Sequence, residues 1–166
     1  MTSLFAQLFL SIQTRIKSAV PEIAWIDQDL GQIDWYQTRP PVSWPCVMID
    51  FPETGYGDLS QGVQWATPVI RIRLGFSPFS SANSVAPDIS KEAALQFFEI
   101  ENKLFKALQG FDGGGITQPM TRTSVVNEKR NDPYRVRQMT FTTATEDSEA
   151  QNSLSLQEAL LNLIVQ

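Results

Sequence analysis

The feature that most limits the fold is an alternating segment in the middle of the chain. Four large apolar side chains alternate there with residues of other kinds. They are Ile70, Ile72, Leu74 and Phe76, against Arg71, Arg73 and Gly75. A period of two is typical of a β-strand that buries one face and leaves the other polar. Such a strand needs neighbouring strands and an apolar layer over its buried face, so the fold must be built on a sheet.

Four other segments have the composition of strands. Residues 46–51 form a compact apolar run between two prolines, which is typical of a buried strand. The other three segments are 22–27, 121–128 and 134–141. In the last of these the apolar phase shifts at Gln138, from which we predict a β-bulge. Residues 53–62 contain three glycines and predict a loop or hairpin connection.

Two main helices are predicted from apolar residues that recur every three or four positions. The first covers residues 3–20. The second begins near Asp88 or Ser90 and runs to about Leu108, and Gly110 follows where a C-terminal cap belongs. The predicted fold class is α+β, a mixed, mainly antiparallel sheet of about five strands with the two main helices packed on it and a short C-terminal helix.

The domain organisation is predicted to be simple. A length of 166 residues fits one domain, and we expect it over residues 1–145, followed by a polar spacer and a docking helix over 146–166. The capping box Ser155-x-x-Glu158 opens this last helix. A helix this short is held only by packing, so it must dock on its own domain or on a neighbouring subunit. We favour the neighbour, because the spacer provides the reach.

The chain lacks most materials for catalysis. It contains no histidine and one cysteine, Cys46. Ser-His-Asp and Cys-His catalysis and zinc sites built from His and Cys are therefore excluded. The segment from Asp27 to Gly31 resembles the start of a calcium loop but lacks the later glycine and glutamate of that loop. We predict no catalytic residue, no metal site and no cofactor, and hence a protein that is not an enzyme.

The charge balance is acidic, with 13 Lys and Arg against 18 Asp and Glu, a net charge of −5. A free-standing nucleic-acid binder usually needs a basic patch or stripe, because phosphate neutralisation dominates that affinity. No run of basic residues occurs in the sequence. Nor does any stretch approach the roughly 20 apolar residues of a membrane helix. We expect neither general nucleic-acid binding nor membrane association.

Arginines alternate along two of the predicted strands. Arg71 and Arg73 share one face of the first, and Arg135 and Arg137 share one face of the second. If the two strands are neighbours, the four guanidinium groups line one face of the sheet. That arrangement is compatible with a contact face for an acidic partner or for passing DNA, although the pattern by itself favours the simpler alternative. The alternative is ordinary solvent-facing alternation.

Aromatic side chains crowd the loop-rich first half of the chain, where such residues often anchor interfaces. The candidate interface residues are Trp35, Tyr36 and Trp44, with Leu160, Leu161 and Ile164 from the C-terminal helix. Core packing is the alternative for at least half of the aromatics. The apolar, charge-poor composition and the loop aromatics together predict self-association.

The order of these segments resembles a known group of proteins. An amphipathic helix leads through the Val-Pro-Glu-Ile segment at 20–23 to an aspartate-rich loop with Gly31-Gln32. A proline-bounded strand at 44–51, the alternating strand ending at 70–74, one helix and a closing hairpin follow. Over nearly the whole chain, this architecture resembles the small tail and neck proteins of tailed bacteriophages, in the tail terminator or tail completion group.

The resemblance implies a function in assembly. Such proteins form a ring, typically a hexamer, that stops tail-tube polymerisation and joins the tube to the head connector. DNA passes through the ring without sequence-specific contact. The implied partners are further copies of the chain, the tail-tube protein and the head–tail connector proteins. The implied location is the tail or neck of the virion, after assembly in the cytoplasm of the bacterial host.

Two alternatives stay open at this point. One is another neck or baseplate-associated structural protein of a phage. The other is a cytosolic ligand-binding or enzyme-accessory domain whose aromatic loop forms a pocket.

Overall fold

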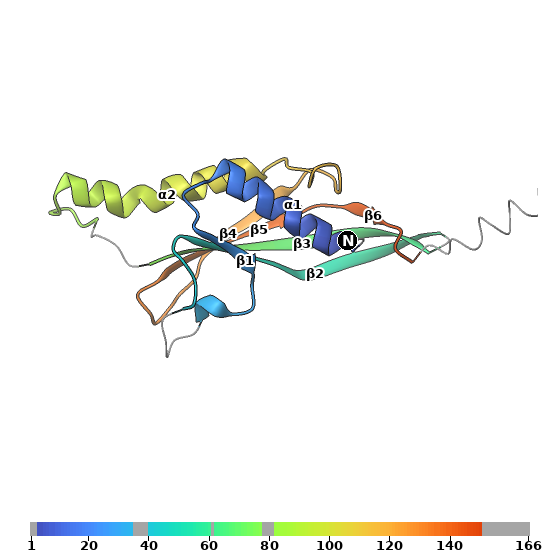
Figure 1. Ribbon diagram of the computed structural model, residues 1–166, viewed down its shortest axis with the longest axis horizontal. Helices are drawn as coiled ribbons and strands as arrows, with labels where there is room; N and C mark the ends of the chain where they lie inside the picture. Colours follow the sequence, from blue (N-terminus) through green and yellow to red (C-terminus); the bar gives the residue numbers. More distant parts are fainter. Residues whose placement is uncertain (1–2, 35–39, 61, 78–81, 151–166) are drawn as a thin grey trace, which may run out of the picture.

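The computed structural model describes residues 3–34, 40–60, 62–77 and 82–150. In this part of the chain, two α-helices, one 3-10 helix and six strands follow one another (Figure 1). They are α1 (Leu4–Ala19), β1 (Trp25–Gln28), η1 (Gln32–Asp34), β2 (Cys46–Ser60), β3 (Val63–Phe76), α2 (Asp88–Leu108), β4 (Thr121–Asn127), β5 (Arg135–Thr142) and β6 (Thr145–Asp147). The α+β class is confirmed, and the predicted C-terminal helix lies outside the described residues.

The strands form one mixed sheet in the order β1-β2-β3-β5-β4, and β6 pairs with β3 beside this row. Only β1 and β2 are parallel; the remaining pairs are antiparallel. The alternating segment from which the sheet was predicted is β3, and it lies at the centre of the sheet. The prediction of a mixed, mainly antiparallel sheet is therefore confirmed.

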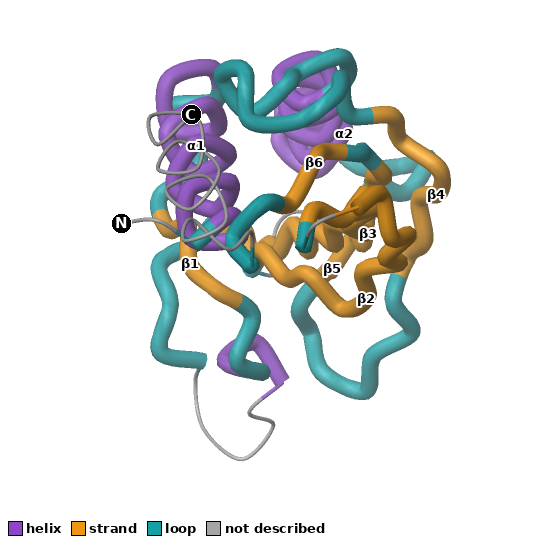
Figure 2. The backbone as a smooth tube through the Cα atoms, turned by 90° about the vertical axis from the view of Figure 1, so that its right-hand side faces the viewer, coloured by secondary structure: helices purple, strands orange, loops and turns teal. Residues whose placement is uncertain are grey.

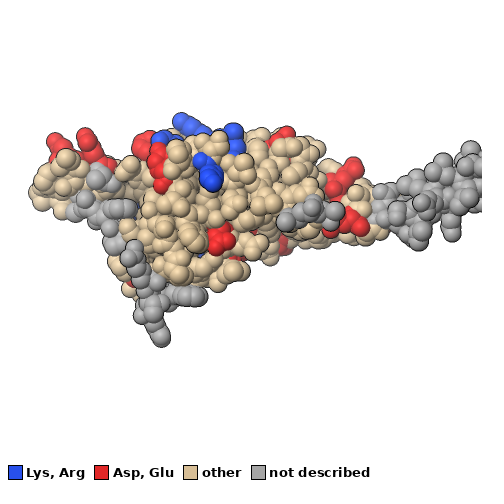
Figure 3. All heavy atoms as spheres, in the orientation of Figure 1, with Lys and Arg blue, Asp and Glu red and all other residues tan. Residues whose placement is uncertain are grey.

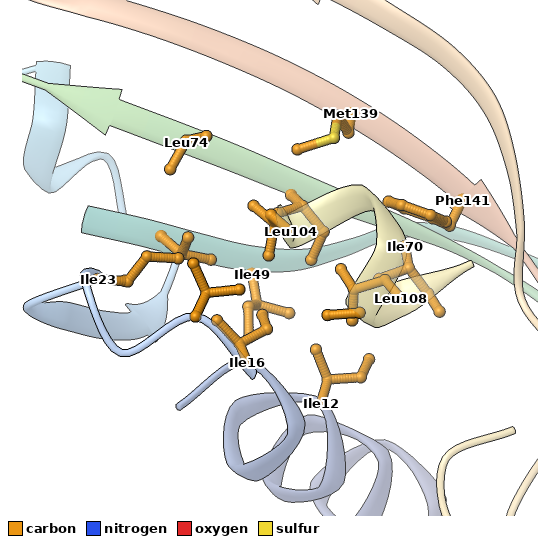
Figure 4. Packing of buried hydrophobic residues seen from close by; sticks show 14 of the residues in the cluster. Ile12, Ile16, Ile23, Ile49, Ile70, Leu74, Leu104, Leu108, Met139 and Phe141 are labelled. Atoms are coloured by element: carbon orange, nitrogen blue, oxygen red, sulfur yellow. The ribbon is translucent and has the colours of Figure 1, made fainter. Parts of the chain in front are cut away.

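Both helices cover the same face of the sheet (Figure 2). In Figure 4, Ile12 and Ile16 of α1 and Leu104 and Leu108 of α2 point toward apolar side chains of the strands, among them Ile70. All five are fully buried. Removing such side chains from water supplies the main driving force for folding.

A second, smaller apolar cluster lies on the opposite face of the sheet. It consists of Ile33, Val42, Cys46, Met48 and Val136, with Trp44 packed against it. Segment η1 lies on this side, away from the helices (Figure 2). Apolar side chains are thus buried on both faces at this end of the sheet.

The second cluster explains why the predicted β-bulge at Gln138 is wrong. Strand β5 pairs with β3 without interruption from Arg135 to Thr142. Val136 belongs to the small cluster, whereas Met139 belongs to the large one on the helix side. The apolar phase shifts because the strand is covered on different faces along its length.

For residues 53–62, the prediction of a hairpin is confirmed and its alternative, a loop, is wrong, because β2 and β3 continue through this region as a long two-stranded arm (Figure 1). Gly55 pairs with Thr67 and Gly57 with Trp65. A Cβ atom at Gly55 would lie only 2.8 Å from the hydroxyl oxygen of Thr67, so this glycine permits a close cross-strand approach. Of the three glycines in this segment, only Gly62, with φ of +81°, has the left-handed backbone of a turn.

The predicted polar spacer, which starts at residue 146, begins within strand β6. Thr145 pairs with Ala66, and Asp147 pairs with Gln64. The Thr145 hydroxyl also donates to the Ile116 carbonyl at 2.7 Å. Polarity alone predicts a connection here, but the edge of the arm supplies hydrogen-bond partners that the sequence does not reveal.

Candidate interaction surfaces

The largest polar cluster surrounds Arg73 of β3, on the sheet face away from the helices. Its Nε donates to Glu128 Oε1 at 2.7 Å, and its Nη2 donates to Asp34 Oδ1 at 2.8 Å. Its Nη1 donates to Asp29 Oδ2 at 3.0 Å. The side chains of Arg73 and Asp29 are each only 9% exposed. One guanidinium on β3 thus binds the segment after β1, segment η1 and the residue after β4.

Arg130 extends this cluster toward the connection between β4 and β5. Its Nη1 donates to Asp34 Oδ1 at 2.7 Å and its Nε to Asp132 Oδ1 at 3.0 Å. Its Nη2 donates to the Ile33 carbonyl at 2.6 Å. We call these six residues the arginine clamp: Asp29, Asp34, Arg73, Glu128, Arg130 and Asp132. The clamp fixes η1 against the β4–β5 connection.

Each charged group of the clamp is paired with another charged group of the clamp. Burial by itself would lower the pKa of Arg73, but hydrogen bonds to Glu128, Asp34 and Asp29 raise that pKa above its ordinary value. The hydrogen bond from Arg73 in turn holds the pKa of Asp34 below its ordinary value. Buried charges are tolerated when such partners surround them. The arrangement suits the positioning of loops, because its charged groups are already paired with one another.

Trp44, a predicted interface residue, packs inside the subunit next to the clamp. It stacks on Tyr134 with ring centroids 4.7 Å apart and an interplanar angle of 8°. It also contacts the smaller apolar cluster and is half-buried. The other predicted interface residues are Trp35, Tyr36, Leu160, Leu161 and Ile164, and they lie outside the described residues. Their interface role stays a prediction.

The four alternating arginines do not share one face of the sheet, so that prediction is wrong. The strands are neighbours, as assumed, but their register pairs Arg73 with Gln138 and Leu74 with Arg137. Paired residues point to the same side of a sheet, so Arg71 and Arg73 point away from the helices and Arg135 and Arg137 toward them. An offset of one residue in the register of β3 and β5 therefore places the two pairs of arginines on opposite faces of the sheet.

The four arginines also differ in their partners. Arg73 lies in the clamp, and Arg137 forms an ion pair with Glu101 of α2 at 2.9 Å. Arg71 lies 3.4 Å from Asp50, with 38% of its side chain exposed. Arg135 packs against aromatic rings of α2. An acidic partner or passing DNA would therefore meet these residues at separate places.

Cys46 lies in the smaller apolar cluster and is fully buried. Burial raises the pKa of its thiol to about 12. The thiolate is the reactive form of cysteine, so this residue is protonated and inert at neutral pH.

Sequence reasoning missed two projecting ends of the molecule, which lie on opposite sides in Figure 1. One is the arm formed by the β2–β3 hairpin beyond residue 52, with exposed Tyr56, Leu59 and Trp65. The other is the N-terminal half of α2, where Leu95 and Phe98 are exposed. Trp65 was an available signal for the arm, because it is an aromatic residue that precedes the buried part of β3. Exposed apolar groups on projecting elements are typical of protein interfaces.

Other types of site find little support in the described part of the chain. No group of three or more His, Cys, Asp or Glu side chains there is arranged to hold a metal ion. No helix among the same residues is long and apolar enough to cross a membrane. A shallow groove of about 450 Å³ runs along α1, lined by Leu10, Ser11, Thr14, Arg15, Ser18 and Phe111.

Comparison with known proteins gives a match of fold. No protein-family model and no curated protein sequence matches the chain. The structure is similar to a chain from the virion of a native gene transfer agent (GTA) particle, with a TM-score of 0.52 and 12% sequence identity. The match covers 89% of this chain and 100% of the other. At this identity the comparison establishes a shared fold.

Proposed function

We propose that the chain is a structural subunit of a phage-like virion. The observation that carries the proposal is the fold shared, over 89% of this chain, with a chain of the GTA virion. The two projecting ends with exposed apolar side chains support a role in assembly. The residues of the clamp are paired with one another, which suits a structural rather than an enzymatic role.

Within the virion, we propose that the subunit is a tail terminator. Copies form a closed ring that ends the tail tube and joins it to the head connector, and DNA passes through without sequence-specific contact. The support is the resemblance of the segment order to the tail terminator group, together with the fold match to a virion protein. The segment that carries Trp35 and Tyr36, and the C-terminal Leu160, Leu161 and Ile164, are proposed to contact neighbouring subunits.

Native mass spectrometry of the full chain tests this proposal. At tens of micromolar subunit, within the range of ordinary interface affinities, we expect one defined homo-oligomer, alone or after addition of the tail-tube protein of the same virus. Electron microscopy of that oligomer should show closed rings. A chain that stays monomeric or dimeric under both conditions overturns the proposal and favours a binding module.

A further inference from the structure

Arg135 forms no hydrogen bond and no ion pair with a carboxylate among the described residues, and the nearby Glu101, which acts on it electrostatically, is paired with Arg137. Its guanidinium carbon lies 3.5 Å from the ring centroid of Phe97 and 5.4 Å from that of Phe98. Its Nε is buried and has no hydrogen-bond partner. The nearby Arg137 differs, because Glu101 accepts hydrogen bonds from it at 2.9 and 3.0 Å. A half-buried guanidinium without an acceptor is costly, so the Arg135 side chain is suited to receive one from outside the subunit.

Exposed apolar side chains lie beside this arginine. Phe98, whose ring faces Arg135, is 48% exposed, and Leu95, one helical turn earlier on α2, is 46% exposed. This half of α2 projects beyond the end of the sheet (Figure 1). An arginine bordered by aromatic and aliphatic groups is typical of the centre of a protein interface. We call Leu95, Phe97, Phe98 and Arg135 the Arg135 surface.

The β2–β3 arm has complementary properties. Tyr56, Leu59 and Trp65 supply exposed apolar groups. Every charged residue of the arm and of β6 is acidic: Glu53, Asp58, Glu146 and Asp147. Figure 3 shows acidic side chains at the arm and at the projecting end of α2, and Lys and Arg gathered over the helices between these two ends. Asp58 and Tyr56 are two residues apart on β2, so both point to the same side of the arm.

The arm and the Arg135 surface of one subunit are too far apart to meet. Strand β3 runs from Val63, at the tip of the arm, to Phe76, which pairs with Arg135. At roughly 3.3 Å per residue, this strand separates the two surfaces by about 43 Å. Contact between them therefore requires two copies of the chain. Two different patches that bind each other generate a ring when the rotation between copies closes.

We infer that the acidic arm of one copy docks on the Arg135 surface of a second copy. The Asp58 carboxylate accepts hydrogen bonds from Arg135, and Tyr56 packs on Phe98 and Leu95. This inference rests on the self-association in the proposed function and names the two surfaces that produce it. The occupant is a second copy because its arm supplies both acidic groups for Arg135 and apolar groups for Phe98 and Leu95.

Charge exchange between the two surfaces tests the inference. Arg135→Glu and Asp58→Lys should each raise the subunit concentration needed for half-assembly at least about tenfold, because each places like charges in contact. The double variant, with both substitutions in one chain, should restore assembly toward that of the unchanged protein. Lys106→Glu is the matched control, since it makes the same charge change at an exposed position of α2's last turn and should leave assembly unchanged.

The readout is native mass spectrometry and sedimentation, with circular dichroism to verify folding. If Arg135→Glu does not fold, Arg135→Gln removes the charge with a smaller change in shape and should weaken assembly in the same direction. Oligomers that are unaffected by both Arg135 variants and by Asp58→Lys overturn this inference and leave the proposed function intact. Loss and restoration as described, but in open chains rather than closed rings, support the docking and contradict the terminator ring. A monomer at up to about 1 mM, with and without tail-tube protein, overturns both.

Discussion

The two faces of the central sheet are stabilised by different interactions. The helix-covered face buries a continuous apolar cluster built from α1, α2 and three strands. The opposite face buries a few apolar side chains beneath the arginine clamp. Apolar burial is non-directional and stabilises many arrangements, whereas hydrogen-bonded ion pairs require defined geometry. The comparison indicates that the helix face supplies most of the stability and that the clamp fixes where the loops lie.

The largest effect is expected from a cavity in the helix-side cluster. Phe141→Ala should lower the free energy of unfolding by about 4 kcal/mol, because Phe141 is fully buried in that cluster. Urea denaturation followed by circular dichroism measures the change. Val126→Ala, at a position that is 51% exposed, is the control and should cost under about 0.5 kcal/mol. Equal losses in the two variants would contradict the assignment of the core.

Removing the central charge of the clamp should be nearly as damaging. Arg73→Met leaves the buried carboxylate of Asp29 without its arginine, which costs about 3 kcal/mol. Arg71→Met, on the same face of the same strand, removes only a partly exposed pair and should cost under about 1 kcal/mol. Denaturation midpoints of both variants test the difference. If Arg71→Met is the more damaging, the clamp is not the main polar support of this face.

Overpacking the smaller cluster should have an intermediate effect. A Cβ atom at Gly75 would lie 2.7 Å from a ring carbon of Trp44 and 2.9 Å from the Cys46 sulfur. Gly75→Ala should therefore cost about 1–3 kcal/mol. Gly57→Ala, in the arm, meets nothing within 4 Å and should change the unfolding free energy by less than about 0.5 kcal/mol. Thermal unfolding of the pair would show whether the cluster behind Trp44 is as tightly packed as described.

The smallest effect is expected from acid. Because Arg73 lowers the pKa of folded Asp34 below that of the unfolded chain, the stabilisation from Asp34 is complete above about pH 4. It is lost as the pH falls through the lower, folded pKa. Arg73 itself stays protonated throughout this range, because its pKa is raised. Asp34 is 36% exposed, so its pair should contribute under about 1 kcal/mol.

Unfolding free energies measured between pH 6 and about pH 2 test this linkage. Asp34→Asn should flatten the loss of stability below about pH 4. A variant with the same pH dependence as the unchanged protein would mean that other carboxylates account for the acid effect.

Periodic segments were predicted well because local chemistry specifies them. Both helices and the central strand were found where the repeats of three to four residues and of two residues place them. Gly110 follows α2 with a φ of +77°, as expected for a residue just past a helix end. These features depend on residues close together in the sequence.

The errors all involve contacts between distant segments. At 53–62 the glycines left a loop open beside the hairpin, because their cross-strand partners are not visible in the local sequence. The shift at Gln138 was interpreted as a bulge because a second cluster on the other face was not anticipated. The four arginines were assigned to one face of the sheet. The sequence suggests that their two strands are neighbours, but it does not reveal the register of the pairing, which is offset by one residue.

The fold class follows from the amino-acid sequence alone, because apolar periodicity and capping are local properties of the chain. The absence of histidine excludes histidine-dependent chemistry, and the net charge of −5 without any run of basic residues argues against general nucleic-acid binding. The three carboxylates that Arg73 binds come from three separate segments, and only the folded chain brings these segments together. The structure also shows that Arg135 Nε has no hydrogen-bond partner and that the guanidinium lies beside exposed Phe98, at the end of β3 opposite the arm. The partners of a charged side chain depend on register and on which segments fold against it, and neither is encoded in its immediate neighbours.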